Sequence, residues 1–225
     1  MHNKIIYGVY GLMGLAMISI SCQNQLNTPI TPASPTSQVT TETTVLTTSS
    51  VTLPAVAPGW RRFQFTGVTI DLPPAYLVSS DEAKNRWADL TALGLEEESI
   101  AALLEKFITP AKIFAVDKTT MNQKFVTNMM ISIDSGSKAK SLDDYRATVV
   151  KELTTEWQIQ KQDKVADRLR ISAISKDATK PVNLIVYLAN SKNQYWLTVF
   201  TTATDRLDKQ LPEFDSIIKS MHINF

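Results

Sequence analysis

Apolar and polar residues follow two different periods along the chain beyond residue 59, and each period predicts one type of element. A period of two marks the first two predicted strands, which are joined by a turn at Thr66 and Gly67. Their apolar positions are Phe63, Phe65, Val68, Ile70 and Leu72. Pro73 and Pro74 end the second strand, because proline has no N–H group to donate to a strand ladder.

Two helices are predicted between residues 81 and 108, where apolar residues recur at helical spacing. Asp81 caps the first helix and Gly94 ends it. The acidic run at 96–98 opens the second helix and Lys106 lies near its end, so the charges at both ends suit the helix dipole. The apolar faces are Ala83, Trp87 and Leu90 in the first helix, and Ile100, Leu103, Leu104 and Phe107 in the second.

Two further helices are predicted in the second half of the chain. The first begins after Ser141, which together with Asp144 resembles a capping box with aspartate in the place of glutamate. The second follows Asp208, and Pro212 is expected only in its first turn, because a proline further in removes a helical hydrogen bond. The apolar faces are Leu142, Tyr145, Val149 and Leu153, and then Phe214, Ile217, Ile218 and Met221.

Further strands are predicted at 111–116, 125–133, 157–162, 165–175, 182–190 and 194–202. Residues 191–193 form a turn that predicts a hairpin between the last two of these strands. The run at 184–188 is continuously apolar, as in a central strand that is covered on both faces. Strands joined by tight turns favour antiparallel pairing. The element order therefore predicts an α+β fold: an α/β/α sandwich with a central, mainly antiparallel sheet that helices cover on both faces.

Residues 23–58 differ in composition from the rest of the chain. Thr, Ser and Pro dominate this segment, Glu42 is its only charged residue, and no aromatic residue occurs in it. Such a segment buries too little apolar surface to offset its chain entropy, so it is predicted to be disordered. The predicted organisation is a signal peptide at 1–21, a lipid-anchored Ser/Thr/Pro-rich disordered linker at 22–58, and one globular domain at 59–225.

The first residues have the three parts of a secretory signal peptide: Lys4, an apolar run at 5–20, and small residues before Cys22. The apolar run is shorter than the roughly 20 residues that a membrane-spanning helix needs, although a retained transmembrane anchor is one alternative. Cys22, the only cysteine, lies at the predicted cleavage point, as in bacterial lipoproteins, where this thiol carries the lipid. Ser19 departs from the leucine of that pattern. We predict lipidation of Cys22 and an extracytoplasmic, membrane-anchored protein; cleavage by ordinary signal peptidase gives a secreted one instead.

Charge gives no reason to expect a nucleic-acid partner. The chain has 23 Lys plus Arg against 22 Asp plus Glu, whereas nucleic-acid binders present a concentrated basic face. We interpret the basic pairs Arg61 with Arg62 and Arg168 with Arg170 as solvated strand ends. A single cysteine excludes an intramolecular disulfide.

The sequence offers few groups for catalysis, because it contains no G-x-S-x-G, no phosphate-binding glycine loop and no H-E-x-x-H motif. His222 is the only histidine beyond the signal peptide, and we interpret it as a partly exposed strand residue. We therefore predict that the protein is not an enzyme and has no catalytic, cofactor-binding or metal-binding residues. The candidates for a binding anchor are the tryptophans Trp60, Trp87, Trp157 and Trp196, of which Trp196 fits core packing better.

Two pairs of carboxylates are the remaining candidates for chemistry. Asp143 with Asp144, and Asp163 with Asp167, have the oxygen ligands of a weak Ca²⁺ site or of an acid/base pair. The favoured interpretation is helix-start charges for the first pair and a solvated turn for the second. The run at 96–98 is likewise interpreted as a helix start before it is considered as a metal site.

Several stretches of the sequence carry a resemblance to a known family. They are FTGVTIDLP at 65–73, residues 129–133 with SLDDY at 141–145, QYWLTVFTT at 194–202 and FDSIIKSM at 214–221. These stretches resemble the PsbP-like family, which includes the extrinsic photosystem II protein, a Ran-binding nuclear import factor and many bacterial envelope lipoproteins. The resemblance implies the α+β fold of that family. Because its members mostly bind other proteins, it also implies a protein partner.

Two functions remain open at this point. The first is a non-catalytic domain of an envelope lipoprotein that acts in protein–protein interaction or assembly, with the linker providing reach. The second is a lipoprotein that binds a small molecule or a metal ion in a pocket between sheet and helices. A rise of several degrees in the melting temperature with one compound would favour the second.

Overall fold

The computed structural model describes residues 53–79 and 111–223, except for residues 121, 122, 124, 136, 180 and 193. The predicted signal peptide, Cys22, most of the predicted linker and the two helices predicted between 81 and 108 lie outside the described residues.

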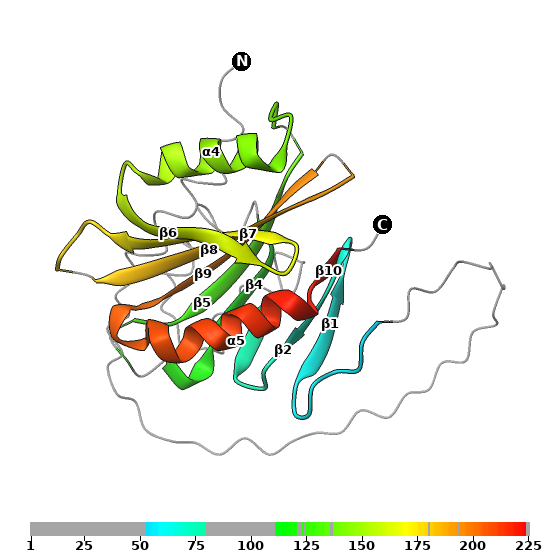
Figure 1. Ribbon diagram of the computed structural model, residues 1–225. Helices are drawn as coiled ribbons and strands as arrows, with labels where there is room; N and C mark the ends of the chain where they lie inside the picture. The colour runs from blue at the N-terminus through cyan, green and yellow to red at the C-terminus, as the bar shows by residue number, and fades with distance from the viewer. Residues whose placement is uncertain are drawn as a thin grey trace, which may run out of the picture.

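A seven-stranded sheet forms the centre of the described fold, and each neighbouring pair in it is antiparallel (Figure 1). The strand order is β3-β4-β5-β9-β8-β7-β6. The predicted hairpin of the last two long strands is confirmed as β8 and β9. The strands are β3 (Tyr76–Ser79), β4 (Ala111–Asp117), β5 (Asn128–Asp134), β6 (Trp157–Val165), β7 (Arg168–Ser175), β8 (Val182–Ser191) and β9 (Gln194–Ala203).

A second, three-stranded sheet contains β1 (Arg61–Phe65), β2 (Val68–Leu72) and β10 (His222–Ile223), in the order β1-β2-β10. The predicted hairpin at the start of the domain is confirmed as β1 and β2. This hairpin lies outside the large sheet, because a turn in which Tyr76 N donates to Pro73 O at 3.0 Å separates β2 from β3. The chain returns to β2 only through its last strand, β10.

The described helices are α4 (Leu142–Leu153) and α5 (Leu207–Ser220), with short 3₁₀ turns η2 (Lys118–Thr120) and η3 (Thr204–Arg206). The cap predicted for α4 is confirmed, since Asp144 N donates to Ser141 Oγ at 3.1 Å. The prediction that Pro212 lies in the first turn of the last helix is wrong. The turn η3 leads directly into α5, so the helix begins at Leu207 and Pro212 lies in its second turn. The ring nitrogen there has no hydrogen to donate to the carbonyl of Asp208.

Three strand boundaries differ from the sequence prediction. Strand β3 was not predicted, because four residues between two prolines and a helical pattern show no clear period. Residues 125–127 precede β5 and do not belong to it. Val165 belongs to β6, and the turn that follows it is made by Ala166, whose φ is +54°, and Asp167.

Replacing Ala166 by glycine is expected to raise the free energy of unfolding by about 0.5 kcal/mol, because glycine adopts a positive φ without the steric cost that a Cβ adds. Valine at this position is expected to lower it by about 1 kcal/mol, because a β-branched side chain fits this conformation worst. Urea unfolding of both variants, followed by tryptophan fluorescence, measures the two effects. Equal destabilisation by glycine and valine would show that residue 166 is not in the left-handed region.

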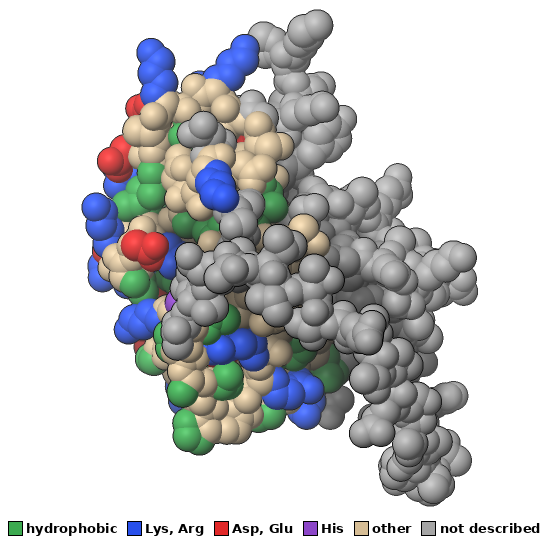
Figure 2. Space-filling view, turned by 90° about the vertical axis from the view of Figure 1, so that its right-hand side faces the viewer, with side chains coloured by type: hydrophobic (Ala, Val, Ile, Leu, Met, Phe, Trp, Pro, Cys, Tyr) green, Lys and Arg blue, Asp and Glu red, His purple; other side chains and the backbone are tan. Residues whose placement is uncertain are grey.

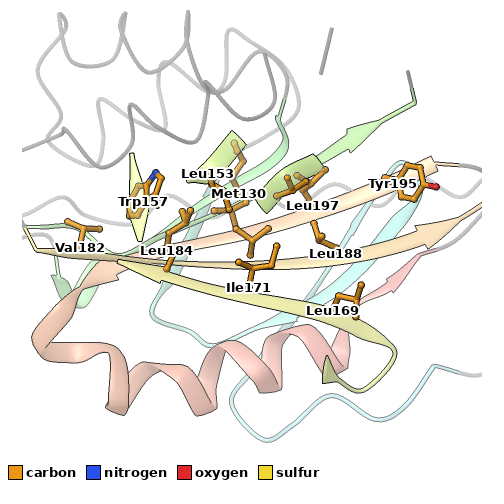
Figure 3. Packing of buried hydrophobic residues seen from close by; sticks show 14 of the residues in the cluster. Met130, Leu153, Trp157, Leu169, Ile171, Val182, Leu184, Leu188, Tyr195 and Leu197 are labelled. Atoms are coloured by element: carbon orange, nitrogen blue, oxygen red, sulfur yellow. The ribbon is translucent and has the colours of Figure 1, made fainter. Parts of the chain in front are cut away.

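Hydrophobic side chains form one cluster on each face of the large sheet. The α4 cluster joins Tyr145, Val149 and Leu153 of α4 to residues of β7, β8 and β9, part of which Figure 3 shows. Its labelled members are Met130, Leu153, Trp157, Leu169, Ile171, Val182, Leu184, Leu188, Tyr195 and Leu197. Residues 182–189 of β8 are all buried, which confirms the prediction of a central strand covered on both faces.

The α5 cluster lies on the opposite face, where α5 and the three-stranded sheet share the covering of the large sheet (Figure 1). Its members include Val68, Ile70 and Leu72 of β2, Ile185 and Tyr187 of β8, Phe200 of β9, and Phe214, Ile217 and Ile218 of α5. The α+β class and the antiparallel sheet are thus confirmed. On the α5 face, β1 and β2 cover part of the large sheet in addition to the helix.

Candidate interaction surface

The residues that the sequence offered for catalysis lie apart and have structural roles. His222 is half-buried in β10, where it pairs with Thr69 of β2, which confirms its interpretation as a partly exposed strand residue. Asp143 forms an ion pair with Arg146 at 3.1 Å, and both it and Asp144 lie in the first turn of α4. These two carboxylates are therefore helix-start charges, as expected.

The interpretation of Arg168 and Arg170 as solvated strand ends is wrong, because their exposed fractions are 6% and 8%. The side chains point to the α5 face of β7. Arg168 donates to Asp167 Oδ1 at 2.5 Å and to the carbonyl of Met221 at 2.8 Å. Arginine is suited to this place, since its stem packs on apolar neighbours while its head makes hydrogen bonds.

Arg170 is the centre of the most strongly bonded charged cluster among the described residues. Its Nε and Nη2 donate to the two carboxylate oxygens of Asp163 at 2.7 and 2.6 Å. Its Nη1 donates to Asp215 Oδ1 and Oδ2 at 2.8 and 2.9 Å, and the hydroxyl of Tyr187 donates to Asp215 Oδ1 at 2.6 Å. These hydrogen bonds from Arg170 lower the pKa of Asp163 from 3.8 to about 2. Asp163 is therefore an ion-pair partner and not the solvated turn residue that was expected.

A second polar cluster surrounds Gln210 of α5. Its Nε2 donates to Asp117 Oδ2 at 3.3 Å, and its Oε1 accepts from the hydroxyls of Thr202 and, at 3.2 Å, Thr127. Nearby Glu213 is half-buried, and burial, with the charge of Asp117, raises its pKa. The cluster joins α5 to β4 and β9, and its hydrogen-bonding groups satisfy one another.

A third polar contact holds the end of α5. Ser220 Oγ accepts from the backbone N–H of Asp71 in β2 at 3.0 Å. Together with Gln210 and Asp215, Ser220 ties the helix to both sheets at three points along its length. The polar groups on this face thus position α5. In the described ranges, no three His, Cys, Asp or Glu side chains come together in a way that could hold a metal ion.

Of the tryptophans, Trp157 and Trp196 are buried in the core, as the sequence suggested for Trp196, and Trp87 lies outside the described residues. Trp60 is half-buried and directly precedes β1. It belongs to a group of partly exposed residues that we call the β1 surface: Trp60, Arg61, Phe63 and Phe65. This group is the best candidate for a contact with another molecule.

The side chains of the β1 surface are held in place before any partner arrives. The guanidinium of Arg61 lies over the ring of Phe63, 5.3 Å from its centroid, and also donates to the carbonyl of Tyr76 at 3.0 Å. The rings of Phe63 and Phe65 are nearly parallel, with centroids 6.4 Å apart. Trp, Phe and Arg are enriched at protein interfaces, where side chains that are already ordered lose little entropy on binding.

The other arginine of this strand has a structural role. Arg62 points to the opposite face of the small sheet, where its Nε and Nη2 donate to Asp71 at 2.7 and 2.9 Å. The interpretation of Arg62 as a solvated strand end is therefore wrong. Its Nη2 also donates to the carbonyl of Pro54 at 2.7 Å, so Arg62 joins the segment before the domain to the small sheet.

Figure 2 views the molecule from the side on which β1 and β10 lie in Figure 1. On this face hydrophobic side chains lie next to those of Lys and Arg. Sequence reasoning missed the β1 surface, although one signal was available: an arginine followed at alternate positions by two aromatic residues, directly after a proline-rich segment. Only the structure shows that the strand lies at the edge of its sheet.

No family model and no curated protein matches the chain. Among solved structures, the chain is similar to cyanobacterial PsbP (CyanoP) of Synechocystis at 13% identity, over 78% of this chain and 98% of that chain, with a TM-score of 0.44. It is similar to the Ran-binding protein Mog1p of Saccharomyces cerevisiae at 11% identity, over 73% and 95% of the two chains, with a TM-score of 0.45. A third similar structure is protein PA94 of Pseudomonas aeruginosa, at 10% identity, over 72% and 94%, with a TM-score of 0.38. These three similarities are similarities of structure, at 10–13% sequence identity.

Proposed function

We propose that this chain is a bacterial envelope lipoprotein, anchored through Cys22, whose folded domain binds a protein partner and catalyses no reaction. The anchor is supported by the signal-peptide pattern and by the position of the only cysteine. Within the described ranges, no helix has both the length and the apolar character to cross a membrane. The α/β/α layering is part of this proposal, supported by α4 and α5 belonging to clusters on opposite faces of the sheet.

The binding function is carried by one observation: the β1 surface presents preordered Arg and aromatic side chains that are partly open to solvent. The aromatic rings pack partly against the α5 cluster, which holds them in place, while part of their surface stays exposed beside the guanidinium of Arg61. Such groups supply much of the binding energy at protein interfaces. The proline-rich segment before residue 59 would let the domain reach a partner away from its anchor.

Replacing Arg61 by glutamate is expected to reduce capture of the partner at least fivefold in cells. The measurement is crosslinking of the tagged full-length chain followed by mass spectrometry. Lys164→Glu is the matched control, because Lys164 is an exposed strand cation on β6, which belongs to the other sheet. Equal capture by both variants would exclude the β1 surface as the binding site. If neither the variants nor the wild type captures a protein, the chain has no stable partner.

The anchor has its own test. Cys22→Ala is expected to abolish incorporation of labelled palmitate and to release the protein from the membrane fraction, because Cys22 is the only thiol of the chain. The same labelling of Ser21→Ala is the control, since that change keeps the thiol and a small residue before it. Label that persists in Cys22→Ala would contradict the anchor and leave the binding function untouched.

A further inference from the structure

Among the described strands, β1 pairs on one side only, with β2. The hydrogen-bonded turn at Thr66 and Gly67 brings Phe65 opposite Val68, and hydrogen-bonded pairs alternate with non-bonded pairs along an antiparallel ladder. The backbone hydrogen bonds to β2 therefore come from Phe65, Phe63 and Arg61. The backbone N–H and C=O groups of Arg62 and Gln64 point away from β2. Within the described part of the chain, β1 has no strand on that side.

The residues along this edge are exposed or half-buried. Arg61 and Gln64 are exposed, and Arg62, Phe63 and Phe65 are half-buried. An open strand edge is a template for an added strand, because it offers a row of backbone donors and acceptors at the spacing of another extended chain. Strand β6, at one edge of the large sheet, differs from β1: its exposed side chains are Gln and Lys, which discourage pairing.

The side chains beside the edge restrict what an added strand can carry. Its residues opposite Phe63 and Phe65 would lie on the same face as these rings, so apolar side chains fit there. Arg61 has no carboxylate partner among the described residues, and its guanidinium lies on that same face. An acidic residue opposite Arg61 would supply the missing charge.

We propose that β1 binds its partner by strand addition, to an extended segment with apolar residues at alternate positions and a carboxylate opposite Arg61. This inference rests on the proposed function and states how the β1 surface would recognise the partner. A second copy of β1 is a poorer occupant. It brings two further arginines to an edge that already carries Arg61 and Arg62, and like charges across a strand pair are unfavourable.

The chain itself suggests a probe, because β2 is the natural neighbour of β1. Its sequence VTIDL places Val, Ile and Leu opposite Phe65, Phe63 and Arg61. We would use the pentapeptide VTIDE, in which glutamate replaces the residue opposite Arg61, and VTIDK as its matched control. A VTIDE peptide with N-methylated backbone amides tests whether binding needs ladder hydrogen bonds.

The first measurement is amide hydrogen exchange by NMR on the full chain as purified from cells. With saturating VTIDE, exchange at Arg62 and Gln64 is expected to slow at least tenfold, while the amides of Phe63 and Phe65 change little because β2 already protects them. VTIDE is expected to bind about fivefold more tightly than VTIDK. The glutamate of VTIDE forms an exposed ion pair with Arg61, whereas the lysine of VTIDK places a like charge beside it. No slowing at Arg62 and Gln64, or equal binding of the N-methylated peptide, would overturn strand addition.

The second measurement uses variants of Gln64. Gln64→Pro removes an N–H group that points outward, so the β1–β2 hairpin keeps its bonds and VTIDE affinity falls at least tenfold. Gln64→Ala keeps the N–H group and is expected to stay within twofold of the wild type. Unchanged affinity of a folded Gln64→Pro variant contradicts the proposal; if that variant does not fold, the N-methylated peptide gives the same information.

Two outcomes separate this inference from the proposed function. If the chain captures its partner in cells equally well with Gln64→Pro, and VTIDE does not bind, strand addition fails while the binding function stands. If no variant captures a partner, the binding function itself fails. If Arg62 and Gln64 are already protected in the free chain, and ultracentrifugation shows a dimer that Gln64→Pro dissociates, the occupant is a second copy and the proposal of a separate partner is overturned.

Discussion

Replacing Phe214 by alanine is expected to lower the free energy of unfolding by about 4 kcal/mol, which is the usual range for a large side chain removed from a close-packed core. Phe214 is fully buried, and its ring stacks on that of Phe200 with centroids 4.3 Å apart and an angle of 17° between the planes. Both rings lie in the α5 cluster. Alanine would leave a cavity between α5 and β9 that neither the helix nor the sheet can close, because polar contacts hold α5 on either side of residue 214.

Urea unfolding followed by tryptophan fluorescence measures this loss, since Trp196 lies in the same cluster. Lys209→Ala is the matched control on the same helix. Lys209 is exposed and alanine is a good helix former, so its effect is expected to stay within about 0.5 kcal/mol. A loss below about 1 kcal/mol in Phe214→Ala would mean that α5 does not pack on β9 as described.

Replacing Arg170 by methionine is expected to lower the free energy of unfolding by about 3 kcal/mol, because it removes the cation from Asp215 and leaves Asp163 with only its exposed partner Lys161. Methionine keeps much of the apolar stem, so the effect reports on the guanidinium. Arg146→Met is the control, since its ion pair with Asp143 is largely exposed and is expected to contribute less than about 1 kcal/mol. Equal losses of unfolding free energy in the two variants would show that the Arg170 cluster stabilises the fold no more than a surface ion pair does.

The pH dependence of the same pair gives an independent test. Hydrogen bonds from Arg170 hold the pKa of Asp163 at about 2 in the folded chain, against 3.8 ordinarily. Because the folded pKa is lowered, this group stabilises the fold fully above pH 3.8, and the contribution is lost as the pH falls through about 2. The difference in unfolding free energy between wild type and Arg170→Met should therefore narrow across this window. A difference that stays constant would exclude Asp163 as its source.

Local sequence rules predicted the elements that short-range forces stabilise. The Ser141 cap, the β1–β2 hairpin and the β8–β9 hairpin all appear where the periods and turns place them. The rules failed where a neighbour in space overrides the local preference. Pro212 lies one turn deeper than expected because η3 extends the helix backwards, and β3 is a strand because β4 pairs with it.

At the β1 surface, the sequence likewise predicts the local pattern but not the position of the strand in the fold. The sequence contains Arg61, Phe63 and Phe65 at alternate positions, but it does not reveal that their strand is an edge. Nor does it distinguish Arg61, which is exposed, from Arg170, which is 8% exposed and bonded to two carboxylates. Both are arginines in strands with alternating neighbours. Their difference arises from α5, which covers one of them and not the other.

By itself, then, the sequence determined the α+β class, the hairpins, the central position of β8 and the signal-peptide pattern, because these depend on residues that are close along the chain. The tertiary structure alone decided which strands form a second sheet, which arginines are buried, and which strand lies at the edge of the small sheet. These features depend on pairings across long separations, such as β10 with β2 and Asp215 with Arg170. Many alternative pairings satisfy the same local pattern, and the packing of α5 onto both sheets selects among them.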